Sequence, residues 1–412
     1  MPKSISIIGG AYGEDCAYPA RQVFRGSGGR AAAVLAALGA QASLTTALGT
    51  DLLPTFGSIA KKLGYVLNSY PRESDIWFRY RYPLGHPVIY PDSIPRVAYE
   101  APVVADKTLV FGMIEGRPQV HAKRAVYDPQ DGIAAKQFGE NGSTADELAL
   151  VMSYSESKTL TGCAAVETQA EKLISEPGVS VVIIKCGPQG ALVRTRISTN
   201  WVRPFPSKRV YKIGSGDVFS AAFSYSWLIE NKDPVYSAWF ASAAVAAYVE
   251  LAQDCFNADQ KAYFEERARL AIANHSTAHR RDIPETQIYL AGPFFNTAQQ
   301  WLIDEVRAAL TEMGFKVFSP IHEIGLGPAR EVAPADLYAL EQSGLVLALL
   351  DGLDAGTLFE VGYARAREIP VIAIAESVDE PSLTMVIGSG CEITNDLTTG
   401  IYAAGWQLMD DV

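Results

Sequence analysis

Residues 214–223 read Gly-Ser-Gly-Asp-Val-Phe-Ser-Ala-Ala-Phe, a glycine-rich turn that runs directly into an apolar helical segment. Glycines let backbone N–H groups converge at a helix N-terminus, where the helix dipole already favours an anion. A phosphoryl group suits this position, and Asp217 is placed to accept a proton from an attacking hydroxyl. The alternative is that Gly214 to Asp217 only turn the chain and cap the helix.

The sequence around this turn predicts an α/β fold. Up to about residue 250, short β-branched runs alternate with alanine-rich segments whose apolar residues recur every three or four positions. The predicted strands include 5–8, 109–111, 125–127 and 181–185, and the predicted helices include 30–38, 54–63, 216–229 and 235–251.

A second, smaller α/β unit is predicted after a polar interval at residues 274–282, which offers almost nothing to bury. We therefore expect a first domain at 1–272, a linker at 273–285 and a second domain at 286–412. The second domain's predicted strands are 287–290, 316–318, 345–350 and 371–374, and its predicted helices are 297–313, 333–342 and 356–367. Asn296 is expected to cap the first of these helices.

The composition indicates which classes of binding partner and which cellular compartment to expect. The chain has 412 residues and a formal net charge of -11, which disfavours unspecific nucleic-acid binding and favours small molecules. Its five cysteines are scattered without Cys-x-x-Cys spacing, so neither a zinc site nor a disulfide set is indicated. The sequence also lacks an export signal and a continuous apolar run of about 18 residues. These features predict a cytoplasmic protein without a membrane span.

Four glycine motifs in order carry a family resemblance: Ile7-Ile8-Gly9-Gly10-Ala11, residues 25–30, residues 185–191 and the turn at 214–217. Over roughly residues 1–270 the chain resembles the ribokinase-like (PfkB-type) sugar and nucleoside kinases, and its opening is similar to that of pseudouridine kinases. The resemblance implies a three-layer α/β/α domain with a small β lid, ATP as the phosphoryl donor, and Mg²⁺ held largely by phosphates and water.

The same resemblance assigns roles to individual residues. The catalytic base falls on Asp217. The anion hole and the nucleotide side fall on Gly214, Ser215, Gly216, Lys185, Gly187, Gly190 and Glu156. The substrate side falls on Glu14 or Asp15, together with Gly28, Gly29 and Arg30.

The chain departs from this family at the substrate end. Arg30 stands where a sugar-binding asparagine is usual, and Tyr211-Lys212-Ile213 replaces an acidic residue and two threonines. Of the family's Asn-x-x-Glu, only Glu156 is retained. Two hypotheses follow: the phosphoryl acceptor is anionic and meets Arg30, or the domain has become a nucleotide or nucleoside sensor.

A second group of candidate catalytic and binding residues lies in the smaller domain. Residues 288–295 cover the end of a predicted strand and contain the motif Tyr-Leu-Ala-Gly-Pro at 289–293. Residues 350–364 link a later predicted strand to a helix. Loops at the carboxyl ends of parallel strands bind ligands in such sheets. Glu360 has apolar neighbours, and a carboxylate is seldom buried without a partner or a task. The alternatives are a solvated helix face for Glu360 and helix caps for Asp354 and Asp336.

Residues 285–375 resemble the nucleoside 2-deoxyribosyltransferases and the related 2'-deoxynucleoside 5'-phosphate N-hydrolases, whose fold is a smaller Rossmann-like or flavodoxin-like parallel sheet. The resemblance implies that Glu360 is the nucleophile, Asp336 protonates the leaving base and Asp354 binds a sugar hydroxyl. Tyr289, Gly292 and Gly356 would line the substrate. It also implies a homo-oligomer in which a neighbour's C-terminal residue completes the site, and Asn395 is the candidate for that residue.

Two other features are interpreted as structural. The stretch Trp77-Phe78-Arg79-Tyr80-Arg81-Tyr82 could be a nucleic-acid strip, but its period of two favours an alternating edge strand in the lid. His121, His279 and His322 lack the spacing of metal ligands, so no side-chain metal cluster is predicted.

Two functions are consistent with the sequence. In the first, the chain is a bifunctional enzyme of nucleoside or nucleotide metabolism, with a C-terminal N-glycosidase or transferase and an N-terminal sugar or nucleoside kinase. In the second, the N-terminal domain is a catalytically silent sensor that gates a nucleotide-degrading C-terminal domain, in a defence or stress response.

Overall fold

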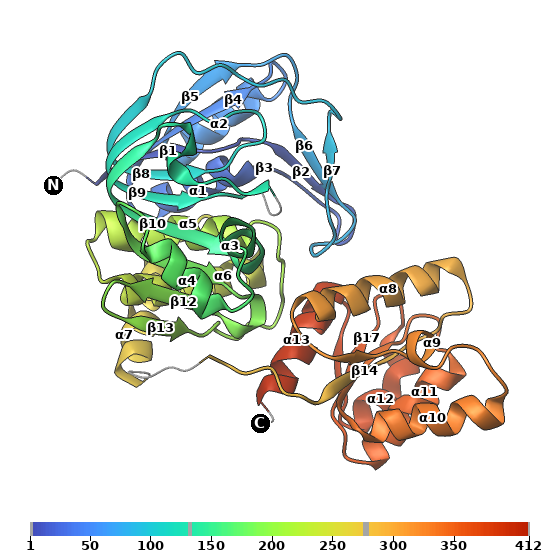
Figure 1. Cartoon of the computed structure of the whole chain (residues 1–412). Helices are drawn as coiled ribbons and strands as arrows, with labels where there is room; N and C mark the ends of the chain where they lie inside the picture. The colour runs from blue at the N-terminus through green and yellow to red at the C-terminus, as the bar shows by residue number, and fades with distance from the viewer. Residues whose placement is uncertain (1–2, 131–133, 275–279, 411–412) are drawn as a thin grey trace. The chain divides into compact units, whose positions relative to one another are not determined.

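The computed structural model describes residues 3–130, 134–274 and 280–410 (Figure 1). The chain divides into two compact units, one formed by residues 1–207 and 211–280 and the other by residues 208–210 and 281–412. Residues 275–279 of the predicted linker, which include His279, lie outside the described residues.

The larger unit is built on a nine-stranded sheet in the order β13-β12-β11-β10-β9-β8-β1-β4-β5. Neighbours from β5 to β11 are parallel, and β12 and β13 add an antiparallel edge. The strands are β1 (Ser4–Ile8), β4 (Gln41–Leu48), β5 (Val66–Pro71), β8 (Val103–Phe111), β9 (Val120–Asp128), β10 (Thr144–Ser153), β11 (Val179–Lys185), β12 (Ala191–Thr195) and β13 (Thr199–Val202).

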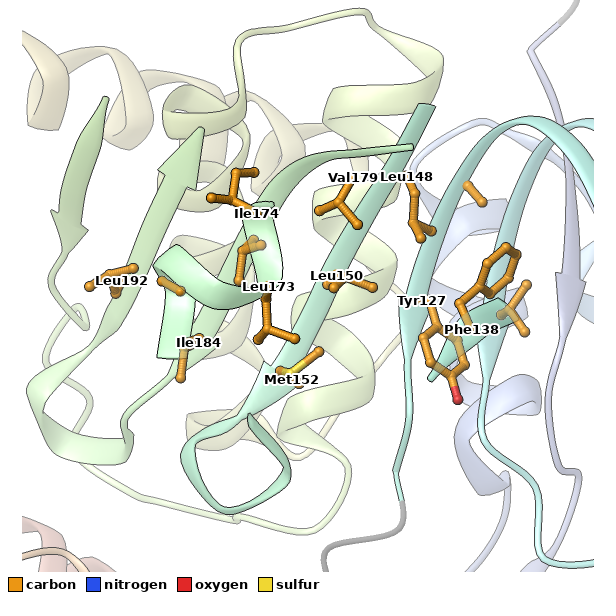
Figure 2. Close-up of a cluster of buried hydrophobic side chains, with 14 of the residues drawn as sticks. Tyr127, Phe138, Leu148, Leu150, Met152, Leu173, Ile174, Val179, Ile184 and Leu192 are labelled. Carbon is orange, nitrogen blue, oxygen red and sulfur yellow. The ribbon is translucent and has the colours of Figure 1, made fainter. Parts of the chain in front are cut away.

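Helices cover both faces of this sheet. Consecutive residues of a strand point to opposite faces, and both Ile183 and Ile184 are therefore fully buried. On one face, Leu150 and Met152 of β10 pack in a cluster with Leu173 of α4 (Figure 2). One helix group contains α3 (Tyr154–Thr161) and α4 (Val166–Ile174). The other contains α1 (Gly26–Ala37), α2 (Leu53–Leu63), α5 (Ser215–Ser224), α6 (Pro234–Leu251) and α7 (Ala258–Asn274). This is the predicted three-layer α/β/α arrangement.

A separate four-stranded sheet has the order β3-β2-β6-β7, formed by β3 (Arg21–Phe24), β2 (Gly13–Cys16), β6 (Trp77–Tyr80) and β7 (Val88–Tyr90). The aromatic stretch forms β6, which pairs with β2 on one side and β7 on the other. The prediction of an edge strand is therefore wrong. Alternation reports that one face of a strand is buried, and it does not distinguish an edge strand from an inner one.

Two helices of this unit differ from their predicted bounds by more than one residue. Helix α1 begins at Gly26, so Gly28 and Gly29 lie inside it. A Cβ atom at Gly28 would lie 2.6 Å from the carbonyl of Gly9, so glycine permits a close helix–strand contact. The segment predicted as one helix at 216–229 is α5 followed by a π-helical turn at Tyr225–Ile229.

The smaller unit contains an all-parallel sheet in the order β15-β14-β16-β17-β18. Its elements are β14 (Gln287–Ala291), α8 (Thr297–Glu312), β15 (Val317–Phe318), α9 (Pro320–Glu323), α10 (Ala329–Glu341), β16 (Ser343–Leu349), α11 (Ala355–Ala366), β17 (Val371–Ile374), α12 (Thr384–Gly388), β18 (Glu392–Thr394) and α13 (Leu397–Asp410). The predicted cap of α8 is confirmed, since the Asn296 side chain accepts from the backbone N–H of Gln299 at 3.1 Å.

Candidate functional sites

The turn at Gly214 brings the start of α5 against the side chain of Arg30. Gly214 has a φ of 78°, in the left-handed region that glycine adopts without a steric penalty. A Cβ atom at this position would lie only 2.2 Å from Cζ of Arg30. Both the backbone conformation and the neighbouring guanidinium group therefore require glycine here.

Arg30, Glu14 and Asp217 form a buried ionic cluster. Arg30 extends from α1 and is 2% exposed. Its Nη1 atom donates to Oδ2 of Asp217 at 2.7 Å, and both of its Nη atoms donate to the carboxylate of Glu14. The other oxygen of Asp217 accepts from Nε2 of Gln130 at 2.6 Å. Both oxygens of the expected proton acceptor are thus already hydrogen-bonded.

The charges of this cluster stabilise one another. Burial lowers the pKa of Arg30, but the negative charges of Glu14 and Asp217 contribute to raising that pKa well above its usual value. Arg30 therefore remains positively charged, and its two carboxylate partners neutralise it.

Of the two acidic residues expected at the substrate end, only Glu14 joins this cluster. Asp15 instead accepts from Nε2 of Gln22 at 2.8 Å and lies 3.8 Å from Nε of Arg79. Because Asp15 is the next residue along strand β2, its side chain points to the opposite face of the strand.

Two lysine amines lie beside the first turn of α5. Nζ of Lys185 lies 2.8 Å from the carboxylate of Asp128, which also accepts from the Ser220 hydroxyl, and Nζ of Lys212 donates to the Ser215 hydroxyl at 2.8 Å. Burial and the nearby positive charge of Lys185 lower the pKa of Lys212 to about 8. These amines and the amide groups of the helix suit an anionic group such as a phosphate.

The remaining residues expected on the nucleotide side have local structural roles. Gly187 and Gly190 have φ values of 56° and 100° in the turn between β11 and β12. Glu156 forms a capping box at the start of α3, where its carboxylate accepts from the backbone N–H of Ser153 at 2.7 Å. A role in ligand binding stays a prediction for all three.

Sequence analysis did not single out Asp128 or Gln130, which stand at the end of β9. Asp128 is 1% exposed, and burial raises its pKa to about 6. Asp128-Pro129-Gln130 follows a parallel strand at its carboxyl end, the edge where such sheets bind ligands. That position is the signal that could have identified both residues.

In the smaller unit, Tyr289 of β14 and Glu360 of α11 form a hydrogen-bonded pair. The fully buried Tyr289 donates its phenolic O–H to Oε1 of Glu360 at 2.6 Å. The ring of Phe318, on the neighbouring strand β15, stacks on Tyr289 with centroids 5.5 Å apart. The phenol is thereby fixed by packing on one side and by the carboxylate on the other.

Glu360 has an unusually high pKa for a carboxylate. Burial raises it to about 7, against the lowering effect of the Tyr289 hydrogen bond, and the negative charges of Asp336 and Asp354 contribute in the same direction as burial. A partly buried carboxylate with a pKa near neutrality is typical of catalytic sites.

Asp336 lies in the interior of α10, because that helix begins at Ala329 after Pro328. The helix-cap interpretation of Asp336 is therefore wrong, because α10 begins before the predicted start at residue 333 and continues through Pro334. Burial raises the pKa of Asp336. Its buried Oδ1 atom has no hydrogen-bond partner among the described residues.

Asp354 caps α11, as one of the alternatives predicted. Its Oδ2 atom accepts from the backbone N–H of Thr357 at 2.8 Å and from the hydroxyl of Thr357 at 3.0 Å. This cap also holds Asp354 near enough to Glu360 to raise the pKa of that carboxylate. The structural role of Asp354 and an effect on Glu360 are therefore compatible.

The other residues expected in this unit are less informative. A Cβ atom at Gly292 would lie 3.0 Å from Cδ1 of Ile303, and one at Gly356 would lie 3.1 Å from Oδ2 of Asp354. Asn395 is exposed between β18 and α13.

Within the described ranges, no group of three or more His, Cys, Asp or Glu side chains is arranged to hold a metal ion. None of the helices in the described part of the chain has the length and apolar character that crossing a bilayer requires.

Two segments match known protein families. Residues 146–261 match the pfkB family of carbohydrate kinases, and residues 288–396 match the nucleoside 2-deoxyribosyltransferases. No curated protein matches the chain significantly. Both family resemblances found in the sequence are confirmed.

Solved structures support the fold of the larger unit. Ribokinase from Thermotoga maritima is 20% identical, with a TM-score of 0.52 over 64% of this chain and 99% of its own. A probable sugar kinase from Rhizobium etli is 13% identical, with a TM-score of 0.50 over 66% of this chain and 99% of its own. The predicted ribokinase-like fold is therefore confirmed.

Proposed function

We propose that the C-terminal unit cleaves the N-glycosidic bond of a nucleoside or its 5'-phosphate, with Glu360 as the nucleophile. The observation that carries this proposal is the partly buried Glu360 carboxylate, which Tyr289 fixes at 2.6 Å. The match of this segment to the nucleoside 2-deoxyribosyltransferases supports the same chemistry.

In the proposed first step, an oxygen of Glu360 attacks the anomeric carbon, and a glycosyl ester forms as the carbon–nitrogen bond breaks. The leaving base takes its proton from Asp336, whose raised pKa suits a general acid. Asp354 accepts a hydrogen bond from a sugar hydroxyl. The ester is then opened by a second base, which makes a transferase, or by water, which makes a hydrolase.

The test is release of free base by the full chain and by Glu360→Ala, measured by chromatography on a panel of nucleosides and 5'-nucleotides. Glu360→Ala is expected to lower the rate at least about a thousandfold. Substitution of the exposed Glu380 to Ala is the matched control and should leave the rate unchanged. Base release that survives in Glu360→Ala would remove Glu360 from its assigned role.

A homo-oligomer formed through the C-terminal unit is part of the proposal. Two aromatic side chains, Tyr338 on α10 and Phe359 on α11, are 67% and 61% exposed and could be covered by a second copy. Light scattering on the full chain should give a mass above that of one chain.

For the N-terminal unit, the first candidate is an ATP-dependent kinase for a sugar or nucleoside, with Asp217 as the base. The pfkB match and the two amines of Lys185 and Lys212 beside α5 support it, since these groups fit the phosphates of ATP. Mg²⁺ bound to those phosphates would neutralise charge on the transferring group.

The second candidate is a sensor that binds a nucleotide or nucleoside without turnover and gates the C-terminal unit. The ion pair between Arg30 and Asp217 favours it, because a base whose oxygens already accept from Arg30 and Gln130 is poorly placed to take a substrate proton. An anionic acceptor is disfavoured for a similar reason, since Glu14 and Asp217 neutralise Arg30.

Asp217→Asn separates the two candidates. It should abolish ADP formation if the unit is a kinase, whereas the sensor hypothesis expects no ADP from either form of the chain. Asp106→Asn, at a 77% exposed side chain, is the control for an unrelated loss of charge.

A further inference from the structure

We infer that Asp351 is a positioning residue for the proposed cleavage reaction: it holds the strained turn at Gly352 and Leu353 in place and so fixes the start of helix α11, which carries Glu360. This inference rests on the proposed function and adds to it a residue that acts through the backbone of the site. Three features of the segment between β16 and α11 support it.

The first feature is a strained backbone conformation shortly after β16. Gly352 and Leu353 have φ values of 88° and 49°. Glycine adopts such values freely, but a bulky residue such as leucine is a steric outlier in this left-handed region. The backbone N–H of Leu353 donates to the carbonyl of Leu350 at 2.9 Å, and the Leu353 side chain packs against the buried core of the unit. Residues held in such conformations cluster at functional sites, and they persist only where their surroundings hold them.

The second feature is the carboxylate of Asp351, which binds the loop that follows β17, the parallel neighbour of β16. Its Oδ1 atom accepts from the backbone N–H of Ser377 at 2.8 Å and from the Ser377 hydroxyl at 2.7 Å. Its Oδ2 atom accepts from the backbone N–H of Glu376 at 3.1 Å. Hydrogen bonds to an ionised carboxylate are stronger than those between neutral groups. Asp351, which directly precedes Gly352, therefore tethers the strained turn to the neighbouring loop.

The third feature is the helix that the turn leads into. Asp354 follows Leu353 directly and caps α11 through the backbone N–H and the hydroxyl of Thr357. The carbonyl of Asp354 accepts from the backbone N–H of Leu358 at 3.0 Å, so the hydrogen bonds of the helix begin at this residue. Glu360 lies in the second turn of the same helix.

A shift of the strained turn would therefore move the proposed nucleophile. A helix is a rigid element, so a displacement of its first turn is passed on to Glu360 and moves it from the place where Tyr289 donates to it. A misplacement of about 1 Å in a reacting group can lower a rate by about a hundredfold. Asp351 opposes such a shift, because it ties the start of the turn while the Asp354 cap ties its end.

The inference is tested by measuring kcat for base release by the full chain and by two variants at position 351. Asp351→Ala should lower kcat by about tenfold or more, because the turn loses its tether. Asp351→Asn keeps a side-chain oxygen that can accept from Ser377, so its kcat should lie within about threefold of that of the parent chain. A purely structural role would lower the unfolding midpoint of Asp351→Ala and leave kcat intact, which would overturn the inference. A loss of kcat that Asp351→Asn does not recover would overturn it as well.

Asp379→Ala is the matched control. Asp379 is an exposed loop carboxylate of the same unit, and it accepts from the Ser382 hydroxyl at 2.9 Å. Its substitution removes the same charge and should leave kcat unchanged. A loss as large as that of Asp351→Ala would show that the charge of the unit controls the rate, and it would overturn the inference.

A double-mutant cycle tests whether Asp351 acts through the strained turn. Asparagine enters the left-handed region more readily than leucine, so Leu353→Asn leaves less strain for Asp351 to hold. Asp351→Ala combined with Leu353→Asn should therefore lower kcat by about threefold or less relative to Leu353→Asn alone. An equal loss in the two backgrounds would overturn the inference.

If no form of the chain releases base, the proposed function fails, and hydrogen exchange then decides this inference separately. Asp351→Ala should speed amide exchange in residues 350–358 by about tenfold and leave exchange in α8 unchanged. Exchange at the parental rate in residues 350–358 would overturn the inference.

Discussion

The guanidinium group of Arg30 and the carboxylate of Asp217, 187 positions apart in sequence, are joined by a 2.7 Å ion pair inside the larger unit. This contact links the segment expected to bind substrate to the residue expected to act as base. It places a permanent cation where a phosphoryl acceptor would have to approach Asp217. The N-terminal unit therefore combines a ribokinase-like fold with a buried ion pair at the start of α5.

Arg30→Met should destabilise the larger unit by about 3–5 kcal/mol, because it leaves the carboxylates of Glu14 and Asp217 buried without a cation. Arg79→Met is the control, since Arg79 is 59% exposed and 3.8 Å from its acidic partner, and it should change stability by less than about 0.5 kcal/mol. Urea denaturation of both variants measures the difference, and equal midpoints would contradict the importance of the cluster.

Gly214→Ala should destabilise the chain by about 3 kcal/mol or more, because it combines an unfavourable φ with a Cβ atom that would clash with Arg30. Gly39→Ala separates these effects: Gly39 has a φ of 95° but nothing within 4 Å of the added Cβ. The control should therefore lose only about 1 kcal/mol. Thermal unfolding of the two variants compares them directly, and a similar loss in both would argue against the close approach of Arg30.

Base release should depend on pH through Glu360. A nucleophile must be ionised, so kcat/KM should rise with pH through the Glu360 pKa of about 7. Tyr289→Phe removes a hydrogen bond that stabilises the carboxylate, so the rising limb should move to higher pH by about one unit. Tyr363→Phe is the control, because its hydroxyl donates to Glu341 instead. A limb that stays in place in Tyr289→Phe would show that another group controls it.

Asp354 should affect stability and activity through separate properties. Asp354→Ala removes the cap of α11 and should cost about 1 kcal/mol, whereas Asp354→Asn can keep the cap and should cost only a few tenths. Both variants should lose activity if the carboxylate binds a sugar hydroxyl. Denaturation midpoints and initial rates of base release measure the two properties, and full activity in Asp354→Asn would leave Asp354 only its structural role.

Much of the architecture could be predicted from local patterns. The β-branched runs became strands because their side chains are buried on both faces, and Asn296 begins α8 as its type and position indicate. Strand lengths were less predictable: β8 spans Val103–Phe111, although only residues 109–111 were predicted. Its first half alternates between exposed and partly buried residues, which weakens the apolar signal.

The sequence predicted several residues of the candidate sites, but it did not predict their hydrogen-bond partners. The apolar residues next to Glu360 in the sequence predicted a partly buried carboxylate. The structure adds its partner, because Tyr289 donates a hydrogen bond to Glu360. Gln130 was not identified, because its contact with Asp217 depends on how β9 and α5 are brought together across the sheet. Long-range pairs of this kind depend on tertiary packing, which a local sequence pattern does not encode.

The Arg30 cluster also limits how this protein can evolve. Losing Arg30 would leave the carboxylates of Glu14 and Asp217 buried without a cation, at a cost comparable to a large part of a domain's whole stability. Replacement of Arg30 by an uncharged residue would therefore require a linked substitution at position 14, because the single substitution is destabilising. Among homologous sequences, an arginine at position 30 should therefore co-vary with acidic residues at 14 and 217.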